Sequence, residues 1–583
     1  MEWEKDKMKI RVKTECEKQF LKNNKFNYSM TLLSLVISAC MDVALAIMLY
    51  FFFVAATTGD NQTLFIGTIA GGVFCALYVL CKIIKRSFMN KYLKTALSQF
   101  KGYVFSKILS KSISEYRRES SAKFISAFSN DLNSIELNYL VGSIDIMGSV
   151  FTFVASGIAM LFFDWRIGLA MIVAAMVCSF LSMKYGRRLV KKESKTANEN
   201  MGFIDQVKDL LNGFIVIKSF RAEKEVLQIF NERNVELEST KQSRRATSET
   251  VTIFGDLAGL LLNSILFSAV FALGIGFGDD AGTGAALLMV FIQLLNYMLV
   301  PVRKIGSGIS NRRAAQALID RISEAIEEDP TYVETEKEEL TGVDGGIEFK
   351  NVNFGYEDDT KNILKNINIK FEKGKSYAIV GSSGSGKSTL LKLILGHMPN
   401  YDGSITIDGK EIKNLSLDSL YEHVSVIQQD VFLFDSTIQN NITMFRDFDA
   451  DKLKSAIERA GLSSLIAEKG DDYPCGECGK HLSGGEKQRV SIARCLVRET
   501  PVLLMDEATA ALDSETAFSV TNEILGIDGL TRIIVTHGLE ESLLLRYDEI
   551  IVIQGGRIVE QGHFNDLMEQ KGYFYSLYNV FQS

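Results

Sequence analysis

A glycine-rich segment at residues 381–388 has the composition and spacing of a phosphate-binding loop. It reads Gly-Ser-Ser-Gly-Ser-Gly-Lys-Ser, follows an apolar run that ends at Val380, and precedes an apolar stretch from Leu390 to Leu395. In a strand, loop and helix of this kind, backbone N–H groups surround phosphates and the positive end of the helix points at them. We predict that Lys387 contacts the β- and γ-phosphates and that the Ser388 hydroxyl binds Mg²⁺. The expected nucleotide-binding residues are Gly381, Ser382, Ser383, Gly384, Ser385, Gly386, Lys387, Ser388 and Thr389.

A pair of carboxylates follows a second apolar run, residues 502–505. Of this pair, Asp506 is predicted to hold Mg²⁺ and Glu507 to polarise the attacking water. Gln429 offers a neutral oxygen to the Mg²⁺ or the water, and His537, which follows another apolar run, offers a hydrogen-bond donor to the γ-phosphate. Glu507, His537 and Gln429 are therefore the predicted catalytic residues, and Ser388, Gln429 and Asp506 are the predicted Mg²⁺ ligands.

Six apolar stretches before residue 305 approach the length of a membrane-spanning helix. Such a helix needs about 20 residues to cross about 30 Å of hydrocarbon. The stretches lie at 30–53, 63–81, 140–163, 167–183, 251–277 and 284–302. They predict a membrane domain and a lipid bilayer as its surroundings.

The connections between these stretches alternate in charge. Residues 82–123 and 184–245 are long and rich in Lys and Arg, whereas 55–62 and 276–284 contain neither. This asymmetry predicts a multi-pass protein of the cell membrane with both termini in the cytoplasm. Apolar residues at helical spacing in the long connections predict that the spans continue as helices into the cytosol.

Composition and chain pattern define the expected domains. The 64 Lys and Arg residues against 71 Asp and Glu residues give a net charge of −7. The sequence has no basic tract with interleaved aromatic residues, so we expect no nucleic-acid partner. An acidic stretch around Pro330 predicts a linker. We expect a membrane all-α domain of six helices at 1–325, a linker at 326–345 and a cytoplasmic α/β P-loop ATPase domain at 346–583.

The segment Leu482-Ser-Gly-Gly-Glu-Lys-Gln-Arg489 narrows the class further. Here the sequence resembles the ATP-binding-cassette (ABC) family, whose signature motif has this form. The resemblance extends to Tyr356 as the aromatic residue that stacks on adenine, Gln429 in the Q-loop, Ala511-Leu512-Asp513 as the D-loop and His537 as the switch histidine. Six spans followed by one cassette look like a half-transporter of the ABC exporter (type IV) fold.

The resemblance implies a dimer that uses ATP and Mg²⁺. In such transporters each ATP lies between the P-loop of one cassette and the signature of the other, here Ser483, Gly484 and Gly485, with Asp513 nearby. The partner is a second half-transporter, identical or different. Coupling helices are implied at about 112–125 and 205–220. The implied function is ATP-driven export of a small amphipathic compound such as a drug, lipid or peptide.

Two features depart from the family pattern. The signature has Glu486 where Gln is the commoner residue, and Cys475 and Cys478 stand in the segment before it. The two cysteines have redox or metal-ligand spacing, but no second pair of ligands lies nearby in the sequence. A structural role is favoured for both, and a redox role stays open.

One intramembrane carboxylate is a candidate substrate contact. Asp42 lies near the middle of the first span, where an ionised carboxylate is costly and is a functional hypothesis by default. Asp145 and Asp256 are weaker candidates near span ends. No Lys or Arg lies within the six spans, so a substrate cation, cavity water or a proton is the expected partner of Asp42.

Two alternatives to export remain. The first is an importer of siderophores with the exporter fold. The second, from a different class, is an ATP-gated channel or regulatory subunit, and the presence of Glu507 argues against it. All five histidines lie in the cassette, which disfavours a pump for bare transition metals.

Overall fold

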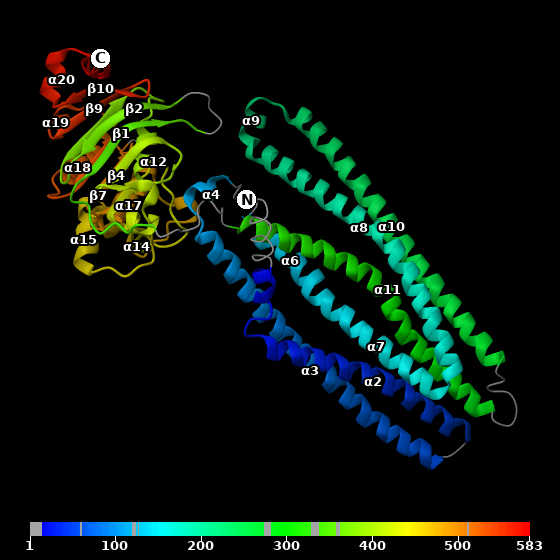
Figure 1. Cartoon of the computed structure of the whole chain (residues 1–583). Coiled ribbons are helices and arrows are strands. Elements are labelled where there is room, and N and C mark those ends of the chain that lie inside the picture. Colours follow the sequence, from blue (N-terminus) through cyan, green and yellow to red (C-terminus); the bar gives the residue numbers. More distant parts are fainter. Residues whose placement is uncertain are drawn as a thin grey trace. The chain divides into compact units, whose positions relative to one another are not determined.

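The chain forms two compact units, which are 1–111 with 115–331 and 112–114 with 332–583. The computed structural model describes residues 14–58, 61–118, 124–125, 127–272, 281–327, 337–356, 362–509 and 512–582. Figure 1 shows that the N-terminal part of the chain is made of long helices and that the C-terminal part combines strands with shorter helices. This order confirms the predicted fold class.

The described helices of the N-terminal part include three that are far longer than a membrane is thick. They are α3, α8 and α10, with 49, 48 and 50 residues, so each is about 70 to 75 Å long at 1.5 Å per residue. The full set is α2 (Lys25–Thr58), α3 (Asn61–Leu109), α4 (Ile113–Arg118), α6 (Leu132–Ser134), α7 (Gly142–Phe163), α8 (Trp165–Asn212), α9 (Phe214–Ser219), α10 (Glu223–Ala272) and α11 (Ala281–Ala325), with π-helical segments at Ala127–Asp131 and Ile135–Val141. The predicted continuation of spans into long helices is confirmed.

Apolar stretches within these helices lie where the spans are predicted. Four described stretches are long and apolar enough to cross a membrane: Lys25–Ala56, Leu64–Leu109, Leu132–Phe163 and Glu223–Ser268. Shorter apolar stretches, Trp165–Val177 and Ala286–Leu299, lie in α8 and α11. Residues 273–280 are outside the described part of the chain. They include the end of the predicted span at 251–277 and the part of the predicted outer loop at 276–284 that precedes α11.

The turn between α7 and α8 depends on two residues. Asp164 caps α8, because its side chain accepts hydrogen bonds from the backbone N–H groups of Arg166 at 2.8 Å and Ile167 at 3.3 Å. Gly168 lies against the backbone of α7, and a Cβ at this position would be 2.8 Å from the Leu161 nitrogen. Only a glycine therefore allows the two helices to approach this closely.

The C-terminal part contains two sheets. The strands are β1 (Ile347–Phe354), β2 (Leu364–Phe371), β3 (Ser376–Gly381), β4 (Asp402–Ile407), β5 (Lys410–Glu411), β6 (Val424–Ile427), β7 (Val502–Asp506), β8 (Thr531–Val535), β9 (Glu549–Gln554) and β10 (Arg557–Gly562). The helices are α12 (Lys387–Ile394), α13 (Leu417–His423), α14 (Ile438–Thr443), α15 (Ala450–Arg459), α16 (Ser463–Lys469), α17 (Gly484–Leu496), α18 (Ser514–Leu525), α19 (Glu541–Leu544), α20 (Phe564–Gln570) and α21 (Tyr573–Gln582).

The larger sheet brings the predicted ATPase residues together. Its strand order is β10-β9-β3-β8-β7-β6, in which β9, β3, β8, β7 and β6 are parallel and β10 is antiparallel to β9. A four-stranded antiparallel sheet has the order β2-β1-β4-β5. Carboxyl ends of parallel strands meet at one edge of a sheet, where ligands bind in such folds. Gly381, Asp506 and Val535, which end β3, β7 and β8, share that edge.

Candidate nucleotide site and membrane chamber

The loop between β3 and α12 adopts backbone conformations that favour glycine. Gly384 and Gly386 have φ values of +75° and +104°, in the region that other residues rarely adopt. At Gly386, which caps the N-terminus of α12, a Cβ would also lie 2.6 Å from Leu364 Cδ2. The loop therefore presents the N-terminus of α12 in the arrangement that binds phosphates.

The side chain of Lys387 is buried beneath this loop. Its Nζ donates to the carbonyl oxygens of Gly381 and Ser382, both at 3.1 Å. Burial lowers the pKa of Lys387, although the charges of Glu507 and Asp506 act in the opposite direction. The Oγ of Ser385 is buried and has no hydrogen-bond partner among the described residues. Within the described part of the chain, this buried ammonium donates only to carbonyl oxygens and lies beside a hydroxyl without a partner, which fits a loop that receives anionic phosphate oxygens.

Ser388 and Asp506 form the part of the site that fits a divalent cation. Ser388 Oγ donates to Asp506 Oδ1 at 2.8 Å. Burial raises the pKa of Asp506 and the charge of Glu507 raises it further, while the hydrogen bond from Ser388 opposes both. Hydroxyl and carboxylate oxygens are ligands that Mg²⁺ prefers, and a cation here relieves the repulsion between the two carboxylates. Thr389, the next residue of α12, is buried.

The three predicted catalytic residues meet directly beyond β7. Gln429 Nε2 donates to Glu507 Oε2 at 2.8 Å, and His537 Nε2 lies 2.8 Å from Glu507 Oε1. The prediction gives Gln429 an oxygen ligand role, but in this structure its amide nitrogen faces Glu507. The side chains of Glu507 and His537 are 19% and 51% exposed, so water reaches the carboxylate that is predicted to polarise it.

The signature segment forms the start of α17. Ser483 Oγ accepts a hydrogen bond from the Glu486 N–H at 3.2 Å, and the Ser483 N–H donates to Glu486 Oε2 at 2.6 Å. The amides of Gly484 and Gly485 begin the helix, where anions bind. Among the described residues, no hydrogen bond or ion pair joins Ser483, Gly484 or Gly485 to the loop that contains Lys387. The P-loop and the signature segment thus form two separate helix N-termini within one chain.

Two further predicted residues lie at ends of elements. Asp513 caps α18, because its Oδ1 accepts a hydrogen bond from the Thr516 N–H at 2.9 Å. Tyr356 follows β1, and its half-buried ring lies edge-on to Phe354 with a centroid distance of 5.2 Å. Ala511 of the predicted D-loop is outside the described residues.

Both parts of the chain match known sequence families. Residues 28–302 match the ABC transporter transmembrane region, and residues 364–510 match the ABC transporter domain. An ATP-dependent lipid A-core flippase of Neisseria gonorrhoeae is 31% identical over 527 residues, which cover 87% of this chain and 82% of that protein. The chain belongs to the ABC transporter family.

Further comparisons define the architecture of this ABC transporter. An uncharacterized ABC transporter ATP-binding protein of Bacillus subtilis, YwjA, is 28% identical over 562 residues, which cover 94% of this chain and 95% of that protein. The structure of a bacterial Atm1-family ABC exporter with ATP bound has a TM-score of 0.82 at 23% identity and covers 96% of this chain and 98% of its own. The chain is a half-transporter of the exporter fold, a membrane protein and an ATP-hydrolysing transporter, as the sequence predicts.

A polar chamber of about 270 Å³ lies within the helical unit of this ABC transporter. Helices α2, α3, α7 and α11 contribute its lining, which is Leu35, Ser38, Asp42, Lys82, Lys85, Asp145, Gly148, Ser149, Thr152 and Tyr297. The Oγ of Ser38 is buried without a hydrogen-bond partner among the described residues. Asp145 thus shares the chamber with Asp42, whereas Asp256 lies on α10 and is not part of this lining.

The prediction about the partner of Asp42 is wrong, because a lysine of the same chain lies beside this carboxylate. Lys82 Nζ lies 3.3 Å from Asp42 Oδ1, and the Tyr78 hydroxyl donates to the same oxygen at 2.9 Å. Lys82 is one residue beyond the predicted span at 63–81, but α3 continues without a break and the long Lys side chain extends along the helix surface. Tyr78 and Lys82 lie four residues apart on one helix face. A Tyr and a Lys at this spacing near the end of a span are the sequence signal that could have identified Lys82 as the partner of Asp42.

The two cysteines before the signature differ in environment. Cys475 is buried, and Asn441 Nδ2 donates to its Sγ at 3.5 Å. Burial raises the pKa of the Cys475 thiol. Cys478 is exposed, and both cysteines are free. These environments support the structural role for Cys475, and a redox role for the pair stays untested.

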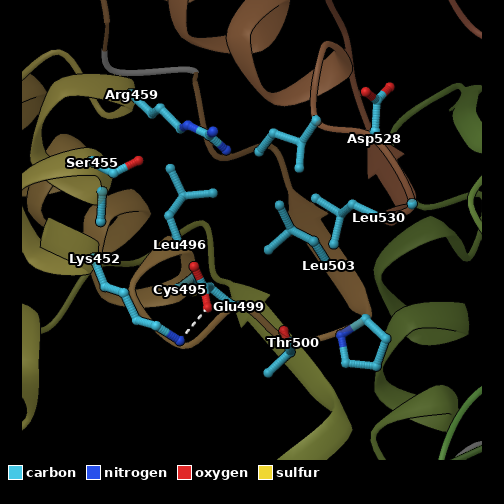
Figure 2. A pocket seen from close by; sticks show the side chains of 14 residues that line it. Lys452, Ser455, Arg459, Cys495, Leu496, Glu499, Thr500, Leu503, Asp528 and Leu530 are labelled. Carbon is cyan, nitrogen blue, oxygen red and sulfur yellow. Dashed lines mark hydrogen bonds and ion pairs between the residues drawn. The ribbon is translucent and has the colours of Figure 1, made fainter. Parts of the chain in front are cut away.

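A second cavity, of about 310 Å³, lies in the cassette away from the nucleotide site. Its lining includes residues 499–501, which precede β7, and residues 527–530, which precede β8. It therefore lies at the edge of the sheet opposite Asp506. Figure 2 shows that Lys452 and Glu499 in this cavity form an ion pair, with an N to O distance of 2.6 Å.

Proposed function

We propose that this protein exports an amphipathic compound across the cell membrane, driven by ATP. The observation that carries this proposal is that one chain combines an exporter-type membrane domain with a cassette whose P-loop, carboxylate pair and histidine lie at one sheet edge. Glu507 faces both Gln429 and His537, and the buried Lys387 faces the loop that receives phosphates.

Within the cassette, we assign roles to the residues that surround the nucleotide. Lys387 and the loop amides bind the β- and γ-phosphates of ATP, and Ser388, Asp506 and Gln429 hold Mg²⁺, which supplies charge neutralisation when bound. Glu507 polarises the attacking water, His537 donates a hydrogen bond to the γ-phosphate, and Tyr356 stacks on the adenine. The short Ser388 to Asp506 contact supports the metal assignment.

The active assembly is proposed to be a dimer in which Ser483, Gly484 and Gly485 complete the ATP site of the partner chain. Their separation from Lys387 within one chain supports this arrangement. The helix α9 lies within the predicted coupling segment 205–220 and exposes Phe214, Ile215 and Val216, with 54%, 78% and 59% of their surface accessible. Apolar side chains exposed in this way mark surfaces that a partner covers. The helix α4 lies in the other predicted coupling segment, of which residues 119–123 are outside the described part.

We place both termini and the cassette in the cytoplasm. Basic residues in the long connections support this orientation, since they favour the cytoplasmic side. The chamber with Asp42 lies about 24 Å from the end of α2 at Thr58, from sixteen residues at 1.5 Å each. That end is then the outer end, and Asp42 lies near the middle of the predicted span at 30–53.

The polar chamber is proposed to hold the polar part of the substrate, and the surrounding lipid-facing helices are proposed to accommodate its apolar part. The relative in Neisseria gonorrhoeae is named for lipid A-core transport, so a lipid is the first substrate to test. Asp42 then contacts the substrate as half of an ion pair with Lys82 and not as an isolated charge.

Transport in liposomes tests the proposal. With the cassettes on the outside, ATP should drive labelled amphiphiles into the lumen, and the Glu507→Gln variant should not support this movement. Panels of lipids, cationic drugs and peptides identify the substrate class. ATP-driven movement of a siderophore out of such liposomes would establish import, and ion conductance without ATP turnover would establish a channel.

A further inference from the structure

The signature of this chain carries a negative charge close to the position proposed for a phosphate. Glu486 is the third residue of α17, which begins with Gly484 and Gly485. Its Oε2 accepts the Ser483 N–H at 2.6 Å, and its own N–H donates to Ser483 Oγ at 3.2 Å. These two reciprocal hydrogen bonds hold the Glu486 carboxylate within one helical turn of Ser483, Gly484 and Gly485. Without a nearby cation, that carboxylate repels the γ-phosphate of the partner chain's ATP.

A lysine from another helix lies beside this carboxylate. Lys469 ends α16, and its Nζ is 3.1 Å from Glu486 Oε1. The side chains of Lys469 and Glu486 are 24% and 16% exposed, so the pair is sheltered more than most surface ion pairs. Each carboxylate oxygen of Glu486 thus has one donor, the Ser483 N–H on one side and the Lys469 ammonium on the other.

The position of Lys469 is fixed by its surroundings. Its Nζ lies 5.2 Å from the ring centroid of Tyr473, and the Tyr473 carbonyl accepts a hydrogen bond from the Ile438 N–H at 3.0 Å. The Tyr473 side chain packs against the cassette core. The lysine therefore approaches Glu486 from an anchored segment.

Both members of the pair are charged at neutral pH. The hydrogen bond with Glu486 raises the pKa of Lys469. Burial acts to raise the pKa of Glu486, but hydrogen bonds from Ser483 and Lys469 outweigh burial and lower that pKa below its ordinary value. The neighbouring Lys487 does not replace Lys469, since its Nζ donates to the Cys478 carbonyl oxygen at 3.0 Å.

We infer that Lys469 is a positioning residue for ATP hydrolysis. It neutralises Glu486 and holds the carboxylate on the Ser483 backbone, so that the Ser483 hydroxyl and the amides of Gly484 and Gly485 meet the partner chain's γ-phosphate without like-charge repulsion. The inference rests on the proposed dimeric ATP site. It also accounts for a signature that has Glu in place of Gln.

Steady-state ATPase kinetics of the full-length chain in liposomes test this role. Lys469→Met should raise the KM for ATP about fivefold, with a smaller change in kcat, because it leaves Glu486 uncompensated where ATP binds. Adding Glu486→Gln to this variant should return KM to within about twofold of the wild-type value, because a neutral Gln needs no compensation. High salt should shrink the Lys469→Met defect, since ions screen a repulsion between partly exposed charges.

Lys452→Met is the matched control. Lys452 also forms an ion pair in the cassette, with Glu499 (Figure 2), but at the opposite sheet edge. Its loss should leave KM unchanged. Equal effects of the two Lys→Met changes would overturn the inference, and so would a double variant as impaired as Lys469→Met alone. The variant Lys387→Ala separates this inference from the proposed ATP site. If Lys387→Ala loses turnover and Lys469→Met leaves KM unchanged, only this inference is rejected. If Lys387→Ala turns over normally, the proposed ATP site itself is rejected.

Discussion

At the scale of single residues, Glu507 should control the rate of hydrolysis. Replacing it with Gln keeps the shape of the side chain and removes the group that polarises water, while Lys387 and its loop are unchanged. We predict that hydrolysis slows by at least about 10²-fold while ATP affinity stays nearly constant. Single-turnover hydrolysis and equilibrium ATP binding measure the two effects. Turnover near the wild-type rate would assign the base to another residue.

Asp42→Asn should change which amphiphiles stimulate the ATPase. The substitution removes the charge that balances Lys82 at 3.3 Å, so it leaves an ammonium in the chamber. We predict that stimulation shifts about fivefold or more toward anionic amphiphiles relative to cationic amphiphiles of similar size. A neutral amphiphile of the same size is the control for general damage. Equal loss for all three would favour a purely structural role for the Asp42 to Lys82 pair.

At the scale of elements, the α7 to α8 turn should be sensitive to any side chain added at Gly168. Gly168→Val places side-chain atoms against the α7 backbone, where a Cβ lies 2.8 Å from the Leu161 nitrogen. We predict a destabilisation of about 1 to 3 kcal/mol, seen as a lower unfolding temperature of the purified protein. Gly72→Val on α3 is the control, because a Cβ there meets no atom within 4 Å.

This comparison separates a packing effect from a helix-propensity effect, since both glycines lie inside helices. Valine should be tolerated at position 72 within about 0.5 kcal/mol. Similar losses at both positions would indicate that the close approach of α7 and α8 is not what requires Gly168.

At the scale of the whole molecule, two defective chains should complement each other. Ser483→Arg disables the signature, and Lys387→Ala disables the P-loop. In a mixed dimer with head-to-tail sites, both defects fall in one ATP site and the other site is intact. We predict that dimers with one chain of each variant hydrolyse ATP faster than dimers of either variant alone. ATPase assays after co-expression of the two variants with different affinity tags measure this difference.

The outcome of this mixing distinguishes two models of the assembly. No recovery in dimers that both tags have purified would contradict the head-to-tail arrangement. Failure to obtain a dimer that contains both tags would contradict self-pairing and would direct the search to a different half-transporter as the partner.

The sequence by itself determined the chemistry of the cassette. The P-loop, Asp506, Glu507 and His537 each follow an apolar strand, and parallel strands bring such ends to one edge. Local pattern was therefore enough to predict that these residues lie together, and the long helices followed from length and periodicity in the same way. The family and the exporter fold were predicted from the resemblance of the signature segment and its companion motifs to the ABC family, and both predictions are confirmed.

Only the tertiary structure decided the electrostatic partners. Asp42 and Lys82 are forty residues apart on different helices. Lys469 and Glu486 lie on α16 and α17, which are connected by residues 470–483, a segment without helical or strand periodicity. An ion pair depends on which faces of two elements meet and on the length of a flexible side chain, and sequence spacing fixes neither. For this reason the sequence identified the carboxylates Asp42 and Glu486, whereas only the fold identified the lysines that balance them.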